Sequence, residues 1–206
     1  MPAPPNKPVF TPNERFKYIA FNKPFQILCQ FTKETGSEKK TLAEFEFPKN
    51  VYSVGRLDYD SEGLLILTDD SRLNDALLNP KHHHRKTYLA QVERIPGADE
   101  LKQLRSGVVI EGRKTLPSNA VLLEADPKVP ERDPPIRFRK NVPTAWIQLC
   151  LHEGKNRQVR KMTAAIGHPT LRLLRVSIGA LKLEDLNLVP GQWTYLSTDQ
   201  IDLLFK

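Results

Sequence analysis

The stretch Gly55-Arg-Leu-Asp-Tyr-Asp-Ser-Glu-Gly-Leu-Leu-Ile-Leu-Thr68 decides the fold. Its second half contains a fully apolar run, residues 64–67, which is typical of a buried strand. Its first half is a short acidic turn with a glycine on each side, and glycines let the backbone bend sharply between two buried strands. We therefore expect the turn to hold Asp58 at a defined position. The alternative is a turn whose aspartates only satisfy their own backbone amides.

The patterns on either side of this stretch predict several short elements. Asp69, Asp70 or Ser71 can cap a short helix that ends before Asn79 and Pro80. Strands are predicted at residues 17–22, 51–54, 87–93 and 146–152, and helices at residues 98–106, about 156–166 and 199–205. Many short strands with few helices predict an α+β fold rather than a succession of βαβ units.

The amino-acid composition limits the classes of protein to which the chain can belong. The chain has 206 residues, 39% of them hydrophobic and 27% charged, which is typical of one globular domain or two small lobes. No apolar run approaches the roughly 20 residues that span a bilayer, and the start lacks a secretory segment. Cys29 and Cys150 are too few for a disulfide framework or a cysteine zinc cluster. We expect a cytoplasmic protein.

Charge is distributed unevenly along the chain. The net charge of +7 favours a polyanionic partner, because Lys and Arg side chains that neutralise phosphates release counterions. Residues 137–161 are strongly basic with Glu153 as their single acid, whereas residues 55–70 are strongly acidic. A proline-rich loop at residues 126–143 carries several of these bases, so we expect it to contact RNA. Residues 1–13, also rich in proline, are expected to form a flexible tail.

Four segments resemble, in order, the motifs of pseudouridine synthases. They are Asn22-Lys23-Pro24, the Gly-Arg-Leu-Asp stretch, Lys86-Thr87-Tyr88, and Glu153-Gly-Lys-Asn-Arg-Gln-Val-Arg-Lys-Met162 with its continuation to Leu174-Arg175. The detailed form is similar to the ribosomal RNA group named for RsuA. Within that group it is closest to a large-subunit enzyme that lacks the usual S4-type domain, both in the third motif and in Asp133-Pro-Pro-Ile-Arg-Phe-Arg-Lys140.

The resemblance implies a fold, a reaction and a target. It implies a catalytic domain over residues 14–206 without an S4 domain, with a mixed, mainly antiparallel sheet in two lobes, a few flanking helices and a central RNA cleft. The reaction would isomerise a uridine of large-subunit (23S) ribosomal RNA to pseudouridine. Because this isomerisation is redox-neutral, no cofactor is expected, and no metal is expected either. The oligomeric state is open, with a monomer as the default. The same chemistry on another RNA, or ribosomal RNA binding without catalysis, remains the alternative.

The resemblance also assigns roles to residues. It makes Asp58 the nucleophile, through attack at C1′ of the ribose, attack at C6 of the base, or elimination at the sugar. Tyr88 would lie against the target base, and Arg160 would keep Asp58 charged or else bind phosphate. RNA-binding residues are expected at Arg56, Lys86, Arg137, Arg139, Lys140, Lys155, Arg157 and Lys161.

Two rival readings of local patterns are weaker. The run His82-His83-His84 could suggest a metal site, but consecutive residues do not share one face and no ligand lies at a suitable spacing. A polar loop facing solvent or RNA is the better interpretation. Asp58 with Asp60 or Glu62 could suggest a glycosidase carboxylate pair, but glycosidases line their sugar sites with abundant aromatics and this chain has 8%.

Overall fold

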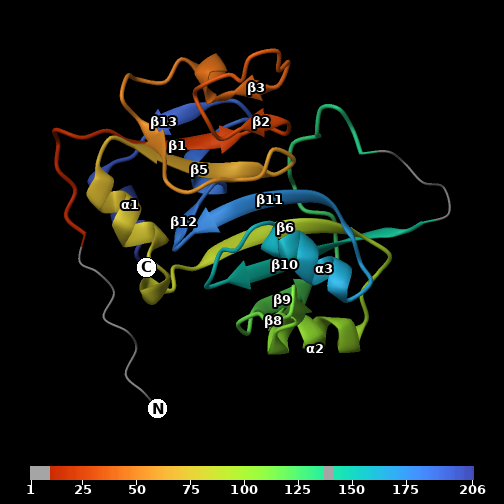
Figure 1. The fold of residues 1–206 in the computed structure, drawn as a ribbon. Coiled ribbons are helices and arrows are strands. Elements are labelled where there is room, and N and C mark those ends of the chain that lie inside the picture. Colours follow the sequence, from red (N-terminus) through yellow and green to blue (C-terminus); the bar gives the residue numbers. More distant parts are fainter. Residues whose placement is uncertain (1–9, 137–141) are drawn as a thin grey trace. The chain divides into compact units, whose positions relative to one another are not determined.

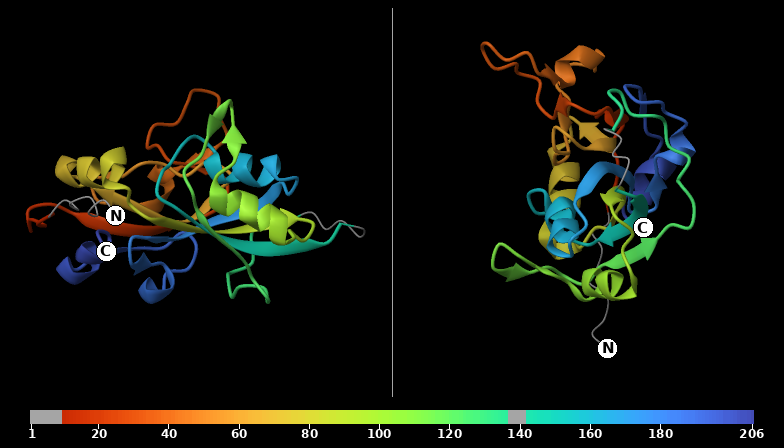
Figure 2. Two further views of the ribbon diagram at one scale, coloured as in Figure 1. Left: turned by 90° about the horizontal axis from the view of Figure 1, so that it is seen from below. Right: turned by 90° about the vertical axis from the view of Figure 1, so that its right-hand side faces the viewer.

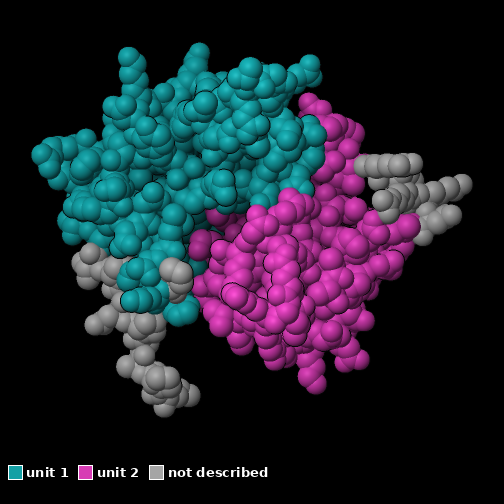
Figure 3. Space-filling model, viewed as in Figure 1, with its two compact units in different colours: residues 1–84, 176–206 teal, residues 85–175 magenta. Residues whose placement is uncertain are grey.

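The chain forms two compact units. The computed structural model describes residues 10–136 and 142–206 (Figure 1). Unit 1 consists of Met1–His84 and Val176–Lys206, and unit 2 consists of Arg85–Arg175 (Figure 3). The chain enters unit 2 after β5 (Glu62–Thr68) and α1 (Ser71–Leu78) and returns to unit 1 along β11 (Thr170–Ile178).

Unit 1 is built on antiparallel strands with β5 among them. Their order is β13 (Trp193–Tyr195), β1 (Tyr18–Lys23), β5 (Glu62–Thr68) and the two-residue β4 (Tyr52–Ser53). All seven residues of β5 are buried, which explains why its central residues 64–67 are apolar without alternation. The end of β11 pairs with β12 (Leu181–Lys182), and η3 (Glu184–Leu186) follows.

Alternate residues of β1 pack against two different groups of apolar side chains, because successive side chains of a strand point to opposite faces. Tyr18 and Ala20 belong to the core that contains apolar residues of α1 (Ser71–Leu78) and α4 (Thr198–Leu203). Phe21 instead contacts the rings of Phe45 and Phe47. These rings come from the segment with the parallel pair β2 (Ile27–Leu28) and β3 (Lys40–Thr41) and with η1 (Leu42–Phe45).

Unit 2 has its own sheet and core. β10 (Thr144–Leu151) pairs antiparallel with β6 (Lys86–Glu93) on one side and with β9 (Asn119–Leu122) on the other. α2 (Ala98–Ser106) and α3 (Gln158–Ala165) pack on the same face of these strands, where Ile147, Leu149 and Leu151 are buried (Figure 2). A short hairpin, β7 (Val109–Ile110) with β8 (Arg113–Lys114), completes the unit.

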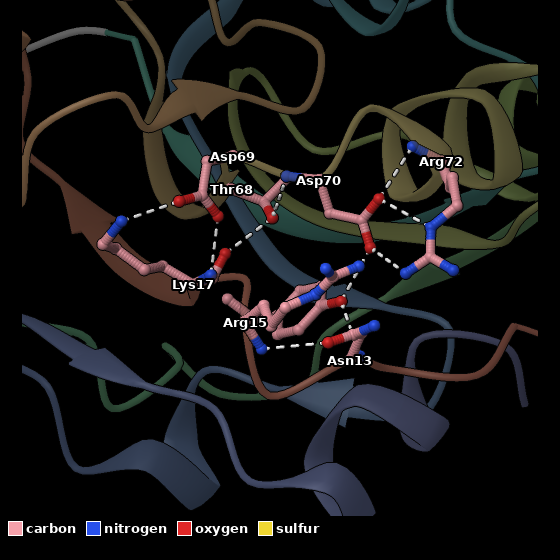
Figure 4. A network of polar contacts seen from close by, with 8 residues as sticks. Asn13, Arg15, Lys17, Thr68, Asp69, Asp70 and Arg72 are labelled. Carbon is pink, nitrogen blue, oxygen red and sulfur yellow. Dashed lines mark hydrogen bonds and ion pairs between the residues drawn. The ribbon is translucent and has the colours of Figure 1, made fainter.

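A polar network closes the C-terminal end of β5 (Figure 4). Asp70 caps α1 by accepting from the Arg72 amide, and its carboxylate also accepts from the Tyr18 hydroxyl at 2.7 Å and from the Arg72 guanidinium at 2.6 and 2.9 Å. Asp69 accepts from the Lys17 amide and ammonium at 2.6 and 2.7 Å. The network therefore joins the segment before β1 to the start of α1.

The α+β prediction is confirmed, and so are most of the predicted elements. The helix capped by Asp70 and the helix that ends at Gly107 lie where the sequence places them. The third helix starts later than expected, at Gln158, because Arg157 adopts a left-handed conformation with φ 51° and acts as its N-cap. Of the expected tail, residues 1–9 lie outside the described residues, and Phe10 stacks on Phe205. Within residues 10–136 and 142–206, no helix is long and apolar enough to cross a membrane.

The expectation of a polar, exposed histidine loop is wrong for His84. This side chain is 6% exposed and its Nε2 donates to the Ala76 carbonyl at 2.7 Å. Its ring packs edge-on against Phe205 at 5.4 Å. His84 follows η2 (Pro80–His82) and binds an otherwise unsatisfied carbonyl near the end of α1, so its role in unit 1 is structural.

Candidate active site

The loop that carries Asp58 is anchored through backbone atoms on both sides of that residue. Directly before it, the Leu57 amide donates to Sγ of Cys29 at 3.4 Å. Three residues after it, the Ser61 carbonyl accepts from Nζ of Lys23 at 2.7 Å. The Ser61 amide also donates to the Asp58 carbonyl at 3.1 Å, which closes a tight turn. The half-buried Asp58 side chain therefore projects from a well-defined backbone.

Gly55 lets the chain enter this turn. Its φ is +69°, in the left-handed region that favours glycine. A Cβ at this position would lie 2.9 Å from Cδ2 of Leu78 on α1. Because Cδ2 is the end of an exposed, flexible side chain that can shift, the glycine is needed mainly for its backbone conformation.

Lys23 is an unusual feature of the site because its side chain is fully buried, at 0% exposed. Its Nζ donates to two carbonyls, of Pro24 at 2.9 Å and of Ser61. Burial lowers the pKa of Lys23 to about 8, although the negative charges of Cys29, Glu62, Asp60 and Asp58 oppose this shift. A buried cation thus lies beneath the acidic loop and favours its negative charge.

Tyr59, the residue after Asp58, has a contact of its own. Nζ of Lys39 lies 5.2 Å from the centroid of the Tyr59 ring, within the range of a cation–π interaction. Lys39 belongs to the polar segment before β3, so this segment reaches the loop that carries Asp58.

Unit 2 holds the other two candidate catalytic residues. Tyr88 lies on β6 opposite Leu149 and packs partly buried against the core of the unit. Arg160 lies on α3, and its Nη1 donates to the Thr170 carbonyl at 3.2 Å, at the start of β11. Val159 and Met162 form the buried side of α3, with Ile166 just beyond its end.

Lys86, two residues before Tyr88, is the second lysine with a shifted pKa. Burial lowers the pKa of Lys86 to about 8, and the nearby positive charge of Arg175 adds to the effect. Arg175 is itself 4% exposed. Two neighbouring cations, one half-buried and one buried, favour an anion, which fits the expectation that Lys86 binds RNA.

The remaining predicted RNA-binding residues are in different environments. Arg56 and Arg157 are exposed. Lys155 pairs with Glu153 at 3.3 Å, and Lys161 pairs with Glu111 at 2.7 Å. Burial alone would raise the pKa of Glu153, but bonds from Leu116, Gln158 and Lys155 outweigh it and hold the pKa below its usual range. Arg137, Arg139 and Lys140 lie outside the described residues.

Sequence reasoning assigned no role to several residues that hold these segments in place. Lys23 and Cys29 anchor the loop around Asp58. Arg132 and Arg172 tie the proline-rich loop to β11, since each donates to a backbone carbonyl of the other's segment, Leu171 at 3.5 Å and Pro130 at 2.8 Å. For Lys23 the available signal was a lysine directly after the predicted strand at residues 17–22, beside a proline. The other three give no signal in periodicity or composition.

The segments that carry these candidate residues match the model of a known protein family. The family model for RNA pseudouridylate synthases matches residues 17–165. The matched region contains the anchored loop with Asp58, Tyr88 on β6 and Arg160 on α3. The chain therefore belongs to the RNA pseudouridylate synthase family and is an isomerase that acts on RNA.

Individual proteins are similar to this chain over most of its length. The chain is 50% identical over 175 residues to "Ribosomal large subunit pseudouridine synthase E" of Xanthomonas campestris pv. campestris, covering 85% of this chain and 92% of the relative. It is 49% identical over 188 residues to the protein of the same name in Vibrio parahaemolyticus, covering 91% and 76%. A solved structure described as "Crystal structure of pseudouridylate synthase" matches with a TM-score of 0.74 and 27% identity, over 92% of this chain and 74% of that one.

Proposed function

We propose that this enzyme converts a particular uridine of large-subunit (23S) ribosomal RNA to pseudouridine, in the cytoplasm and as a monomer. One observation carries the proposal: Asp58 sits on a loop anchored on both sides, in a chain about half identical to enzymes named for the large ribosomal subunit. The net charge of +7 favours a polyanionic substrate. We also propose that residues 14–206 make up the catalytic domain.

The chemistry calls for a carboxylate and for no external reagent. The N1–C1′ glycosidic bond breaks, the uracil rotates, and a C5–C1′ bond forms while the C5 proton is lost and N1 regains a proton. We propose that Asp58 divides this reaction into easier steps as an ionised carboxylate. Attack at C1′, attack at C6 and proton removal in an elimination at the sugar all use this group in the same ionised form. Because the reaction is a redox-neutral isomerisation, we propose no cofactor or metal.

The other residues have proposed roles that rest on their motifs. Tyr88 is the aromatic that lies against the target base, and such stacking contributes about 1–3 kcal/mol per base. Arg160 is the cation of the third motif. The target base must leave its helix to be modified, which implies base flipping. Phosphate contacts are proposed for Arg56, Lys86, Arg137, Arg139, Lys140, Lys155, Arg157 and Lys161.

The test is pseudouridine mapping on ribosomal RNA from cells that lack this gene. The cells are complemented with the wild type, with Asp58→Asn, or with Asp75→Asn as a control, because Asp75 is an exposed aspartate on α1. We expect one large-subunit uridine to lose its mark, and the wild type and Asp75→Asn to restore it. Loss of a pseudouridine in another RNA instead would contradict the proposal that large-subunit ribosomal RNA is the substrate. Restoration by Asp58→Asn would overturn the nucleophile.

A further inference from the structure

Cys29 lies in a well-held segment next to the loop that carries Asp58. It directly follows β2, which pairs in parallel with β3 through Ile27 and Leu28. The next residue, Gln30, accepts a hydrogen bond from the Leu42 amide at 2.9 Å through its carbonyl. The backbone is therefore bound on both sides of Cys29, so that the position of its half-buried side chain is well defined.

The thiol group of Cys29 contacts the loop at the Arg56–Leu57 peptide unit, one residue before the candidate nucleophile. Its Sγ accepts the Leu57 amide proton at 3.4 Å, and the carbonyl of Leu57 is bonded to the nitrogen of Asp58. This contact complements the one from Lys23 to the Ser61 carbonyl. A shift of the Leu57 amide would move the Asp58 Cα, and misplacement by about 1 Å can cost on the order of 100-fold in rate.

Cys29 also lies close to the second anchor of the loop. It is the first-named of the groups whose electrostatic interaction with Lys23 opposes the effect of burial on the pKa of Lys23, so the thiol group is near the ammonium that binds the Ser61 carbonyl.

We propose that Cys29 is a positioning residue, which acts through the Leu57 amide to hold Asp58 at the place required for the chemical step. It does not touch the RNA. This inference rests on the proposed function of Asp58. It predicts that changes at Cys29 lower the rate of the chemical step and leave RNA affinity unchanged.

The experiment measures tritium release from a large-subunit ribosomal RNA transcript labelled at C5 of uridine, in single turnover with saturating full-length enzyme. Cys29→Ala removes the acceptor, whereas Cys29→Ser keeps one. Cys150→Ala is the matched control, because Cys150 is the other cysteine of the chain, is also half-buried, and lies on β10 of unit 2. Asp58→Asn serves as the inactive reference.

We expect Cys29→Ala to react about 10-fold more slowly with its Kd for RNA within about 2-fold of wild type, from the loss of one hydrogen bond and of alignment. Cys29→Ser should stay within about 3-fold of the wild-type rate. Wild-type turnover by folded Cys29→Ala, a Cys29→Ser enzyme as slow as Cys29→Ala, or a loss confined to Kd would each overturn the proposal. If Asp58→Asn also turns over, the proposed nucleophile fails, which is a separate result.

A second measurement covers the case in which Cys29→Ala does not fold. In the Cys150→Ala enzyme, methyl methanethiosulfonate converts the Cys29 thiol to a methyl disulfide and releases methanesulfinic acid. We expect the rate to fall and dithiothreitol to restore it by reducing the disulfide. An enzyme that is modified stoichiometrically at Cys29 and retains its full rate would contradict the positioning role.

Discussion

β5 has an acidic cluster at each end, and the two clusters are held in different ways. At the C-terminal end the carboxylates themselves are bound, Asp70 by Tyr18 and Arg72, and Asp69 by Lys17. At the N-terminal end, hydrogen bonds hold the backbone of the loop instead. Cys29 binds the Leu57 amide, and Lys23 binds the Ser61 carbonyl. At the C-terminal end the carboxylates therefore join separate segments of the chain. At the N-terminal end the bound backbone fixes the position of the Asp58 carboxylate.

The pKa values of the C-terminal cluster reflect this difference. Burial alone would raise the pKa of Asp70, but hydrogen bonds from Arg72 and Tyr18 outweigh it and lower the pKa. The same balance lowers the pKa of Asp69 through its bonds from Lys17. The ionised carboxylates at this end therefore contribute stability that is lost as the pH falls through their folded pKa values. Acidic residues close in sequence are therefore structural at one end of this strand and candidates for chemistry at the other.

The largest expected effect is that of Asp58→Asn, which tests the N-terminal cluster. The amide cannot act as a carboxylate nucleophile or base, so we expect at least about a 1,000-fold loss of turnover. The backbone anchors remain, so the free energy of unfolding should change by less than about 1 kcal/mol. Tritium release and urea denaturation of the same preparation measure both quantities. A large loss of stability without loss of turnover would reverse the comparison between the two ends.

The second effect is that of Asp70→Ala, which tests the C-terminal cluster. The change removes the N-cap of α1, at about 1 kcal/mol, and the acceptor of the buried Tyr18 hydroxyl, at about 1–3 kcal/mol. We expect a loss of about 2–4 kcal/mol in the free energy of unfolding, with turnover of the folded enzyme unchanged. Asp75→Ala, at an exposed position of the same helix, should change stability by less than about 0.5 kcal/mol.

The contrast also shows how far the sequence alone could lead. Apolar periodicity and capping residues predicted β5, α1 and α2, because these signals are local. The choice of Asp58 over Asp69 or Asp70 did not come from such signals, since all three follow or precede the same apolar run. It came from the resemblance to a family motif, and the structure adds the anchors that distinguish the two clusters.

The residues that sequence reasoning missed share a physical reason. Lys23 is fully buried, whereas lysine is almost never buried without a partner, so the residue type itself gives no sign of this burial. Its partners are backbone carbonyls, which carry no sequence signature. The bond of Arg172 to Pro130 joins positions 42 residues apart, and the bond of Cys29 to Leu57 spans 28. Contacts of side chains with distant backbone atoms become visible only in the folded chain.

The third effect concerns the cation beneath the N-terminal cluster. The pKa of Lys23 is about 8 in the folded chain against an ordinary 10.5. Below the lower value both states carry the proton, so the cost of burying the charge is fully present. As the pH rises from about 8 to 10.5 the unfolded chain binds more protons than the folded one, so this contribution makes stability rise with pH.

The measurement compares the wild type with Lys23→Met at several pH values. We expect the difference in their free energies of unfolding to shift in favour of the wild type by about 2 kcal/mol between roughly pH 7 and pH 9.5. Lys86 has the same direction of shift but is present in both proteins, so its effect cancels in the difference. A difference that stays constant with pH would show that Lys23 does not titrate in this range.

The smallest effect is expected for Lys17→Met at the C-terminal cluster. The ion pair of Lys17 and Asp69 is 2.7 Å long, but the Lys17 side chain is 36% exposed, and such pairs contribute about 1 kcal/mol or less. Asp69 also keeps its bond from the Lys17 amide in the variant. We expect a loss below about 1 kcal/mol in the free energy of unfolding, which shrinks with added salt.

Lys182→Met, which removes a more exposed pair with Glu184, is the control and should change stability less. A loss at Lys17 as large as that of Asp70→Ala would mean that charge pairing, rather than the capping and hydrogen bonding of Asp70, holds this end of β5 together.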